Sequence, residues 1–451
     1  MRTTTASALT VLLLSVPIAL VAQAPTAFEH VNVIPMDTER VLTDQTVLVR
    51  DGIIAAMGPA GQVTVPRDAV RVDARGKYLI PGLAEMHAHI PSPQASAGFT
   101  ENVLFLYVAA GVTTVRGMLG HPTHLDLRRR VEAGAVVGPR IWTSGPSVNG
   151  STVATPDSAV RTAMHQRSMG YDFIKIHPGL ARDVFDSLDA AADRAGITLA
   201  GHVPVHVGLR RALEARYWSI DHLDGYVESL AGREGDAAGG WFGVNFAGTV
   251  DPSQIAPLAR ATADAGVWNV PTQTLMESYA QARHLEQLQA RPELRYMPPE
   301  TRQQWINFTT NAARQAPPDD VLERWIAVRR TLLKALQDAG AGLALGSDAP
   351  QVWNVPGFSV HRELESMVAA GLTPYQALET GTRNVARFLG VEDRAGTIAV
   401  GNQADLILLD ANPLANITHT TRRAGVMLRG VWMPQAEIQR RLDGIAAGYG
   451  N

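Results

Sequence analysis

The stretch GLAEMHAHI, residues 82–90, joins an apolar run to two histidines, His87 and His89, which only Ala88 separates. The run before the histidines is typical of a buried β-strand. Side chains two positions apart on a strand point to the same side, so both imidazoles can reach one metal ion. We therefore interpret this stretch as a strand whose carboxyl end carries polar, metal-binding side chains.

The chain after residue 90 alternates between strand-like and helix-like patterns. The strand-like stretches are GVTTVRGM, RIWTSG, YDFIKIH, ITLAGHV, YWSIDHL, GVWNVPT and LALGSDAP, and helical patterns such as LDLRRRVEAG, DVFDSLDAAADRAG and LRRALEA lie between them. Strands separated by helices indicate βαβ units and a parallel sheet. Together with residues 82–90 they give eight strand candidates, which favours a (β/α)8 TIM-type barrel in the α/β class. We expect residues 276–335 to be a helical insertion that covers the pocket mouth.

Both ends of the chain carry short β-type stretches. FEHVNVIPM and QTVLVRDGIIAAMG come near the start, with a hairpin turn expected at Asp51-Gly52, and AGTIAVGNQADLILLDANPL and AGVMLRGVWM come near the end. This arrangement predicts a small β-sandwich domain formed from both termini. The expected boundaries are 25–80 and 391–451 for the small domain and 81–390 for the metal-binding barrel.

Composition narrows the classes of function. The chain has 451 residues, of which 46% are hydrophobic and 18% are charged, as in an ordinary globular protein. A net charge of -3 gives no reason to expect a nucleic acid or an anionic membrane as partner. The chain has no cysteine, so a metal must be held by His, Asp, Glu or a modified side chain. A small-molecule or short peptide substrate is the expected partner, and a homo-oligomer is left open.

Residues 1–24 have the pattern of a secretory signal peptide. Arg2 supplies positive charge, ALTVLLLSVPIALV is apolar but short for a membrane span, and Ala22-Gln23-Ala24 fits a cleavage site. We expect cleavage after Ala24 and a secreted or periplasmic mature protein without a stable membrane anchor. An uncleaved anchor or a buried first helix is the alternative.

Polar residues that can bind metals recur where the predicted barrel strands end. They are His87, His89, Lys175, His202, His222 and Asp348. Each has an ordinary use elsewhere, since a single histidine is usually structural, a lysine can snorkel and an aspartate often caps a helix. Chemistry in such barrels occurs at the carboxyl ends of the strands, so the recurrence of these residue types there predicts one metal site.

The ordered motifs PGLAEMHAH, YDFIKIH, AGHV, SIDH and LGSDAP resemble the metal-binding motifs of the amidohydrolase superfamily. More narrowly, they resemble its imidazolonepropionase-like and Xaa-Pro dipeptidase-like branch. GVTTVRGM, GLTPYQALETGTRNVARFLG and AGTIAVGNQADLILLDANPL are similar to further family segments, so the resemblance covers about residues 28 to 435. It implies a metal-dependent hydrolase of carbon–nitrogen bonds.

The resemblance also implies a role for each candidate ligand. His87, His89 and Asp348 would bind the more buried of two divalent ions, and His202 and His222 the more exposed one. Lys175 would carry carbon dioxide as a bridging carbamate, which removes the repulsion between a bare ammonium and two dications. Zinc is the expected metal because imidazole and carboxylate suit it, with manganese, cobalt or iron left open. Asp348 would be the catalytic proton carrier between the nucleophilic water and the leaving nitrogen.

Three further residues are weaker candidates. His206 lies four residues after His202 and is an alternative ligand at this point of the site. His202 is favoured because it stands directly at the end of the strand. His206 and His177 are then expected to contact substrate. Tyr226 lies just beyond His222 and is a candidate for donating to an oxyanion, with an ordinary loop position as the alternative. His361 and Glu363 lie on a helix-like stretch and are expected to be structural.

The favoured function is hydrolysis of amide bonds in peptides or N-acyl amino acids by a dipeptidase- or carboxypeptidase-like enzyme. The alternatives are a hydrolase of cyclic amides, imidazolones or lactones with the same site, and a barrel that binds ligands without catalysis. GPSVNGSTVATP occupies the place where many dipeptidase-like relatives carry a histidine, and Asn149 cannot supply that charge. A strict dipeptidase specificity is therefore in doubt. Glu85, where Asp is usual, is expected to matter little.

Overall fold

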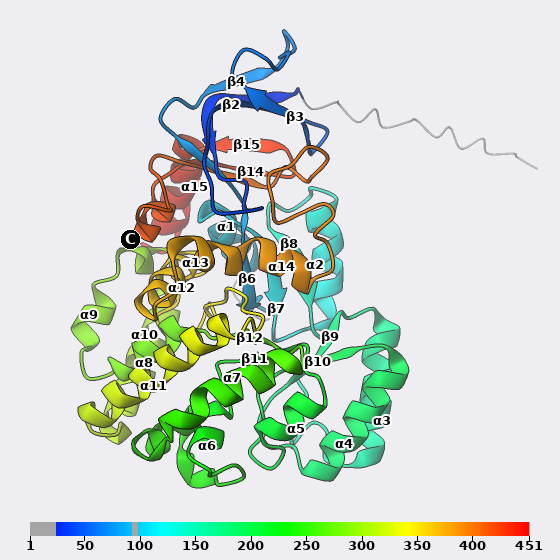
Figure 1. The fold of residues 1–451 in the computed structure, drawn as a ribbon, viewed down its shortest axis with the longest axis vertical. Helices are drawn as coiled ribbons and strands as arrows, with labels where there is room; N and C mark the ends of the chain where they lie inside the picture. The colour runs from blue at the N-terminus through cyan, green and yellow to red at the C-terminus, as the bar shows by residue number, and fades with distance from the viewer. Residues whose placement is uncertain (1–23, 93–97, 451) are drawn as a thin grey trace, which may run out of the picture.

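The computed structural model describes residues 24–92 and 98–450 (Figure 1). The predicted signal peptide lies, except for Ala24, outside the described residues and stays a prediction. Among the helices of the described part, none has the length and apolarity needed to cross a membrane.

Short parallel strands of the described chain form the barrel. In chain order they are β6 (Leu83–Ala88), β7 (Val112–Gly117), β8 (Arg140–Thr143), β9 (Phe173–Ile176), β10 (Thr198–Gly201), β11 (Ser219–Asp221) and β12 (Trp268–Val270). They pair in two runs, β6-β7-β8 and β9-β10-β11-β12. Isolated parallel bridges continue the order, joining Ser144 to Phe173, Asn269 to Leu343 and Ala349 to Ala88. Residues 343–349 therefore occupy the eighth position, which confirms the TIM-type barrel.

Helices follow the strands and cover the barrel (Figure 1). They are α1 (Phe99–Ala109), α2 (Pro122–Glu132), α3 (Pro156–Met169), α4 (Arg182–Ala195), α5 (Leu209–Glu214), α6 (Tyr226–Leu230), α7 (Ile255–Asp264), α11 (Asp319–Asp338), α12 (Phe358–Ala369), α13 (Pro374–Gly381) and α14 (Arg383–Phe388). Their sequences explain why they form. In α4, for example, Val184, Leu188 and Ala191 recur at helical spacing and are buried, and the helix ends at Gly196 in the left-handed conformation.

The segment predicted as an insertion is helical. Between β12 and the eighth barrel position lie α8 (Gln273–Ala280), α9 (Leu285–Gln289), the 3-10 helix η4 (Pro292–Tyr296), α10 (Pro299–Gln315) and α11. A second irregular stretch, with η1 (Ala237–Gly239), η2 (Trp241–Thr249) and η3 (Pro252–Gln254), follows α6. The indole nitrogen of Trp325 in α11 donates to the carbonyl of Phe242 at 2.9 Å, so the two stretches are joined.

Strands from both termini form the second part of the molecule. Its sheet has the order β15 (Val431–Pro434), β14 (Arg423–Leu428), β13 (Leu406–Leu409), β5 (Tyr78–Pro81), β1 (Thr26–Val33), β2 (Leu42–Arg50) and β3 (Ile53–Pro59), with β4 (Val70–Asp73) paired to β1. The prediction that strands from both ends of the chain belong to one β-rich part is confirmed. All of these strands are hydrogen-bonded in one sheet, whose apolar core includes Phe28 and Val47 from one half and Leu406 and Met427 from the other.

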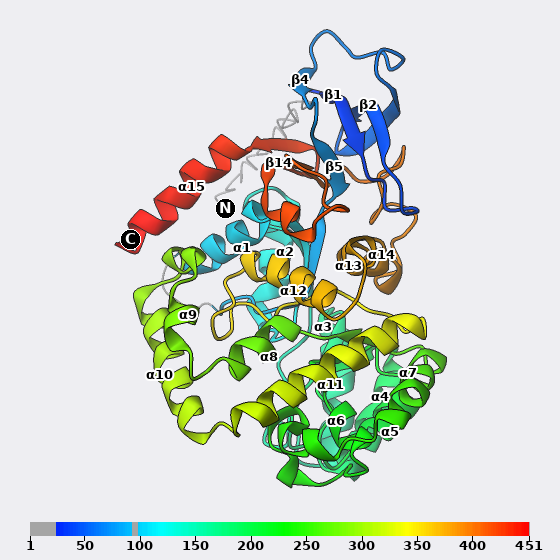
Figure 2. The ribbon, with the colours of Figure 1, turned by 60° about the vertical axis from the view of Figure 1, so that its left-hand side comes forward.

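The chain ends in a helix that the sequence analysis did not predict. α15 (Gln435–Gly448) buries Ile438, Leu442 and Ile445, a spacing of four and three residues that is typical of a helix face. It lies beside α1 of the barrel (Figure 2). The 3-10 helix η5 (Ile417–Thr421) connects β13 to β14. The end of the chain is thus joined to the barrel as well as to the sheet.

Candidate metal centre

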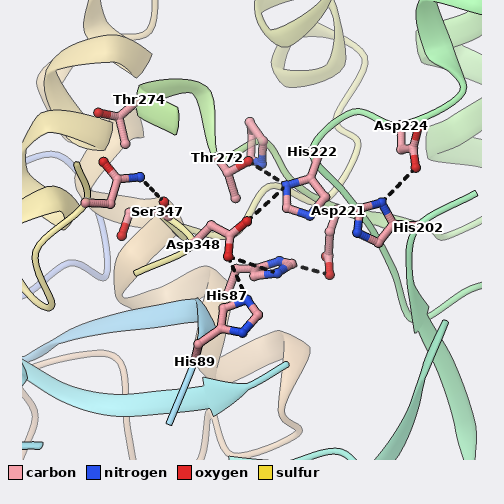
Figure 3. A network of polar contacts seen from close by, with 12 residues as sticks. His87, His89, His202, Asp221, His222, Asp224, Thr272, Thr274, Ser347 and Asp348 are labelled. Atoms are coloured by element: carbon pink, nitrogen blue, oxygen red, sulfur yellow. Dashed lines mark hydrogen bonds and ion pairs between the residues drawn. The ribbon is translucent and has the colours of Figure 1, made fainter. Parts of the chain in front are cut away.

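Imidazoles from four barrel strands lie in a row at the carboxyl ends of the strands (Figure 3). The ring centroids are 5.5 Å apart for His89 and His87, 4.5 Å for His87 and His222, and 4.6 Å for His222 and His202. His177 continues the row 5.2 Å from His202. The structure therefore brings together the histidines that were predicted from positions far apart in the chain.

Asp348 lies against the start of this row. Its Oδ1 is 2.7 Å from Nε2 of His89 and 3.6 Å from Nε2 of His87, and its Oδ2 is 3.8 Å from Nδ1 of His222. Ligand atoms of His87, His89 and Asp348 all lie within 4.8 Å of one another. These three residues could hold one metal ion.

The protonation states of this group suit a cation. Burial, followed by the charge of Lys175, holds the pKa of His87 well below its ordinary value, so its imidazole is neutral. Burial opposes ionisation of Asp348, but His87 and His89 outweigh it and lower the pKa of its carboxyl. Nδ1 of His87 and Oδ1 of Asp348 are buried and lack a hydrogen-bond partner of good geometry. Neutral imidazoles, an ionised carboxylate and unsatisfied buried lone pairs fit a divalent metal.

Lys175 of β9 is fully buried beside Asp221. Its Nζ lies 3.5 Å from Oδ2 of Asp221, and the same oxygen lies 3.1 Å from Nδ1 of His87. Burial lowers the pKa of Lys175, while Asp221 acts in the opposite direction. A lysine with a lowered pKa supplies the neutral amine that reaction with carbon dioxide requires.

Asp221 and its partner Arg116 also belong to the site, although the sequence pattern did not predict them. Nη2 of Arg116 donates to Oδ1 of Asp221 at 3.1 Å, Nη1 donates to Ser219 at 2.9 Å, and Nε donates to the carbonyl of Met86 at 2.7 Å. Arg116 and Asp221 are fully buried. Burial opposes ionisation of Asp221, but Arg116 and Lys175 lower its pKa. The charge pair therefore fixes Asp221 as a carboxylate at the floor of the site.

His202 and His222 each have a partner that orients the ring. Nδ1 of His202 lies 3.0 Å from Oδ2 of Asp224, and Nδ1 of His222 lies 2.8 Å from the hydroxyl of Thr272 (Figure 3). A partner at Nδ1 fixes the ring and leaves Nε2 to face a ligand, as second partners of metal-binding histidines do. Asp224 and Thr272 were not predicted. The only sequence feature that could have indicated a role for Asp224 is its position two residues after His222.

The backbone around these ligands is strained. His222, Thr272 and Asp348 have φ values of 65°, 45° and 65°, in the left-handed region that residues other than glycine rarely adopt. Such conformations persist only where the surrounding structure enforces them, and they cluster at functional sites. In these conformations the side chains of His222, Thr272 and Asp348 lie in or beside the row of imidazoles.

Glu85 is more important than the sequence analysis expected. Its Oε1 accepts from the backbone N–H of His87 at 2.9 Å and of Ser347 at 2.8 Å, and its Oε2 accepts from the Ser347 hydroxyl. It is fully buried. The side chain therefore joins β6 to the segment that carries Asp348, so it sets the distance between the ligands on the two elements.

The two predicted substrate contacts differ in position. His177 is half-buried, its Nδ1 lies 2.6 Å from the hydroxyl of Ser147, and it lines a recess of about 750 Å³ together with Asn149. Oδ1 of Asn149 accepts from the backbone N–H of Ser151 and of Thr152, so Asn149 stabilises its own loop. His206 is exposed in a turn, whereas His202 belongs to the row. The geometry favours His202 as the ligand.

The structure does not place Tyr226 at the site. Its side chain is fully buried, and its hydroxyl lies 3.0 Å from the hydroxyl of Thr262 in α7. It belongs to the apolar core of the barrel. The prediction that Tyr226 donates to an oxyanion therefore has no support in this geometry, because helix packing turns the hydroxyl toward α7.

The fold and the site together define a class, a (β/α)8 hydrolase with polar ligands at the carboxyl ends of the strands. A family model described as "Amidohydrolase family" matches residues 78–433, and the chain belongs to this family. An adenine deaminase of Deinococcus deserti is 27% identical over 374 residues, 82% of this chain. The chain spans about half, 54%, of that relative's length.

Two solved structures resemble most of the chain. Bottromycin amidohydrolase has a TM-score of 0.73 and 25% identity, and the match covers 94% of this chain and 91% of that one. A putative prolidase from Bifidobacterium longum has a TM-score of 0.66 and 25% identity, with 94% and 99% covered. The family, and the predicted resemblance to its Xaa-Pro dipeptidase-like and imidazolonepropionase-like branch, are thereby confirmed.

Proposed function

We propose that the mature chain is a secreted hydrolase that uses two divalent metal ions to cleave amide bonds of peptides or N-acyl amino acids. The observation that carries the proposal is the convergence of His87, His89 and Asp348, with ligand atoms within 4.8 Å of one another. The neighbouring rings of His202 and His222 and the buried amine of Lys175 extend this group. Similarity to bottromycin amidohydrolase and to a putative prolidase supports amide bonds as the substrate.

The proposed ligand sets follow the row of imidazoles. His87, His89 and Asp348 would hold the first ion, and His202 and His222 the second. Lys175 would be carboxylated: its neutral Nζ forms a bond to the carbon of carbon dioxide and loses a proton, which leaves an anionic carbamate between the two sets. Zinc fits the imidazole and carboxylate donors. When bound, the ions would lower the pKa of a water and polarise the amide carbonyl.

The chain's own residues would handle the protons. Asp348 is ionised and buried at the centre of the group, so it can accept a proton from the attacking water and pass it to the leaving nitrogen. Arg116 keeps Asp221 ionised beneath the site. Asp224 and Thr272 hold the rings of His202 and His222 while the substrate carbonyl binds.

A second candidate is hydrolysis of a carbon–nitrogen bond in a ring. It is favoured by the similarity to imidazolonepropionase of Shewanella woodyi, 47% identical over 49 residues. The same site would serve. Only the shape of the substrate would differ.

Metal content of the purified mature protein, measured by elemental mass spectrometry, tests the proposal together with a panel of dipeptides, N-acyl amino acids, cyclic amides and lactones. We expect about two metals per chain and cleavage of linear amides. Turnover of ring substrates alone would favour the second candidate. Absence of metal after supplying zinc and bicarbonate would contradict both.

A further inference from the structure

We propose that a cavity between η2, α8 and α10 binds an uncharged aromatic group of the substrate, such as a phenyl ring. Trp241, Tyr279 and Phe308 line this aromatic cavity. The inference rests on the proposed function, because that function places the reacting amide at the row of imidazoles. It adds a substrate class: amides that carry an aromatic group on the acyl side or on the amine side.

The aromatic cavity suits an uncharged occupant. Its volume of about 420 Å³ lies within the range of pockets that bind small molecules. Among the described residues that line it, none has an acid, lysine, arginine or histidine side chain, and the polar side chains are the amides of Asn245, Asn311 and Gln315. A charged group would find no opposite charge there to offset its loss of water. The walls therefore favour an apolar ring over an ion.

Three aromatic side chains in a row form one wall of the cavity. The ring centroids of Trp241 and Tyr279 are 4.6 Å apart with the planes at 70°, and those of Tyr279 and Phe308 are 5.9 Å apart. Edge-to-face and offset arrangements of this kind are the ones that aromatic groups prefer. A phenyl group of the substrate can extend the same packing.

Two of these rings are left open to solvent. Trp241 and Phe308 are each 44% exposed, and within residues 24–92 and 98–450 no other tryptophan or phenylalanine is exposed. Both line this one cavity. Large apolar surface gathered in a concave site is typical of a place where a ligand binds. The coincidence of the two exposed rings therefore points to an aromatic ligand.

One face of α10 is turned to the cavity. Phe308, Asn311, Ala312 and Gln315 recur at spacings of three and four residues, so they lie on one side of the helix. Phe308, Asn311 and Gln315 are exposed, whereas the buried side chains of α10 are Trp305 and Thr309. The protein itself does not cover this face, so its side chains are available to a substrate.

The aromatic cavity lies close to the row of imidazoles on two sides. Phe242 follows Trp241 in η2, and its ring centroid lies 5.3 Å from that of His222. On the other side, burial and then the charge of Asp348 raise the pKa of Tyr279, so Tyr279 is within electrostatic reach of that carboxylate. A substrate whose amide lies at the row can therefore extend an aromatic group into the cavity.

Two pairs of amides that differ by one phenyl group test the proposal: N-acetylalanine with N-acetylphenylalanine, and N-acetylglycine with N-phenylacetylglycine. With the metal-loaded enzyme, we expect kcat/KM for at least one phenyl amide to exceed that of its partner about thirtyfold. Phe308→Ala should lower this ratio about fivefold, because one ring contact is lost. The fold should be kept, since the ring is exposed and alanine favours a helix.

Two further variants sharpen the test. Ala312→Trp fills the cavity from the same face of α10 and should lower the ratio as well. Met164→Ala is the matched control, because it removes a large apolar side chain that is 53% exposed on α3, outside the cavity. It should keep the wild-type ratio.

The outcomes separate the aromatic site from the proposed function. Equal kcat/KM within both pairs would overturn the aromatic site and leave amide hydrolysis standing. A phenyl preference that survives unchanged in Phe308→Ala and Ala312→Trp would also overturn it. If none of the four amides is cleaved, hydrolysis of linear amides fails, and the cavity is tested by binding alone.

A fluorine NMR titration with 4-fluorobenzyl alcohol provides that test, because this probe has the ring but no amide to hydrolyse. We expect the wild-type protein to bind it more tightly than 3-fluoropropan-1-ol, and Phe308→Ala to bind it about fivefold more weakly than wild type. Met164→Ala should match wild type. Equal affinity in wild type and Phe308→Ala, or no binding to wild type, would overturn the proposal whatever the enzyme hydrolyses.

Discussion

Nζ of Lys175 lies 3.5 Å from Oδ2 of Asp221, and both side chains are fully buried at the carboxyl ends of β9 and β11, the two strands that flank β10. The acid is already paired with Arg116 on its other oxygen. Lys175 contacts only the remaining oxygen of this acid, and its lowered pKa favours the neutral amine that carboxylation requires.

Lys175→Ala is expected to remove almost all turnover and about half of the bound metal, since the bridging carboxylate would be lost. The fold should survive, because an alanine there leaves a cavity next to the site rather than an unpaired charge. Turnover and metal content measured with and without added acetate or propionate check the role. Partial rescue by these acids would support a carbamate, and near-wild-type rates without them would contradict it.

Asp348→Asn is expected to lower kcat about a thousandfold, because an amide cannot carry the proton from water to the leaving nitrogen. Steady-state kinetics and circular dichroism measure turnover and fold separately. A variant that keeps wild-type kcat would show that another group moves the proton.

Tyr226→Phe is expected to change kcat by less than about twofold, since the hydroxyl lies against Thr262 in the helix layer. The cost should appear in stability, at about 1 kcal/mol for the lost hydrogen bond. Kinetics and urea denaturation of the same preparation distinguish the two effects. A large fall in kcat with unchanged stability would restore the oxyanion role.

Arg116→Met is expected to lower the free energy of unfolding by about 3–5 kcal/mol, because the buried carboxylate of Asp221 loses its partner. Arg116 also contacts the ring of Phe173 with its guanidinium carbon 5.3 Å from the centroid, so packing is lost too. Urea denaturation provides the measurement. Arg129→Met, at an exposed position of α2, should change little.

Stability should fall as the pH drops below about 6.5, partly through His361. Burial, and then Arg423, lowers the pKa of His361 to about 3 in the folded chain. Nδ1 of His361 contacts Thr420 at 2.9 Å and its Nε2 lies 2.9 Å from the carbonyl of Ala110. Below pH 6.5 the unfolded chain takes up a proton that the folded chain refuses, so unfolding becomes easier by up to about 1.4 kcal/mol per pH unit.

Denaturation curves between pH 7 and 4.5 measure this slope. His361→Gln should have a shallower slope than the wild-type protein, although its stability at pH 7 is lower because buried contacts are lost. His165→Gln, on the exposed surface of α3, controls for loss of a histidine. Identical slopes in wild type and His361→Gln would contradict the assignment.

The sequence by itself determined the barrel and the candidate ligands at the strand ends. Hydrophobic periodicity is local, so it indicates where a strand ends, and a histidine placed there faces the site whatever lies across from it. That reasoning found His87, His89, His202, His222 and Asp348. The same reasoning predicted β-structure up to the end of the chain. The strand β15 directly precedes α15, and the helical spacing of the apolar residues in α15 was not recognised.

Only the tertiary structure decided which polar groups support the ligands. Asp221 and Asp224 stand beside His222 in the sequence, but one contacts Arg116 and Lys175 whereas the other contacts His202. An acidic side chain can lie buried beneath the site, orient a histidine ring or stand on the surface. Which of these it does depends on which distant strand packs against it. Burial and partners arise from contacts between segments far apart in the chain, and local pattern carries no information about those contacts.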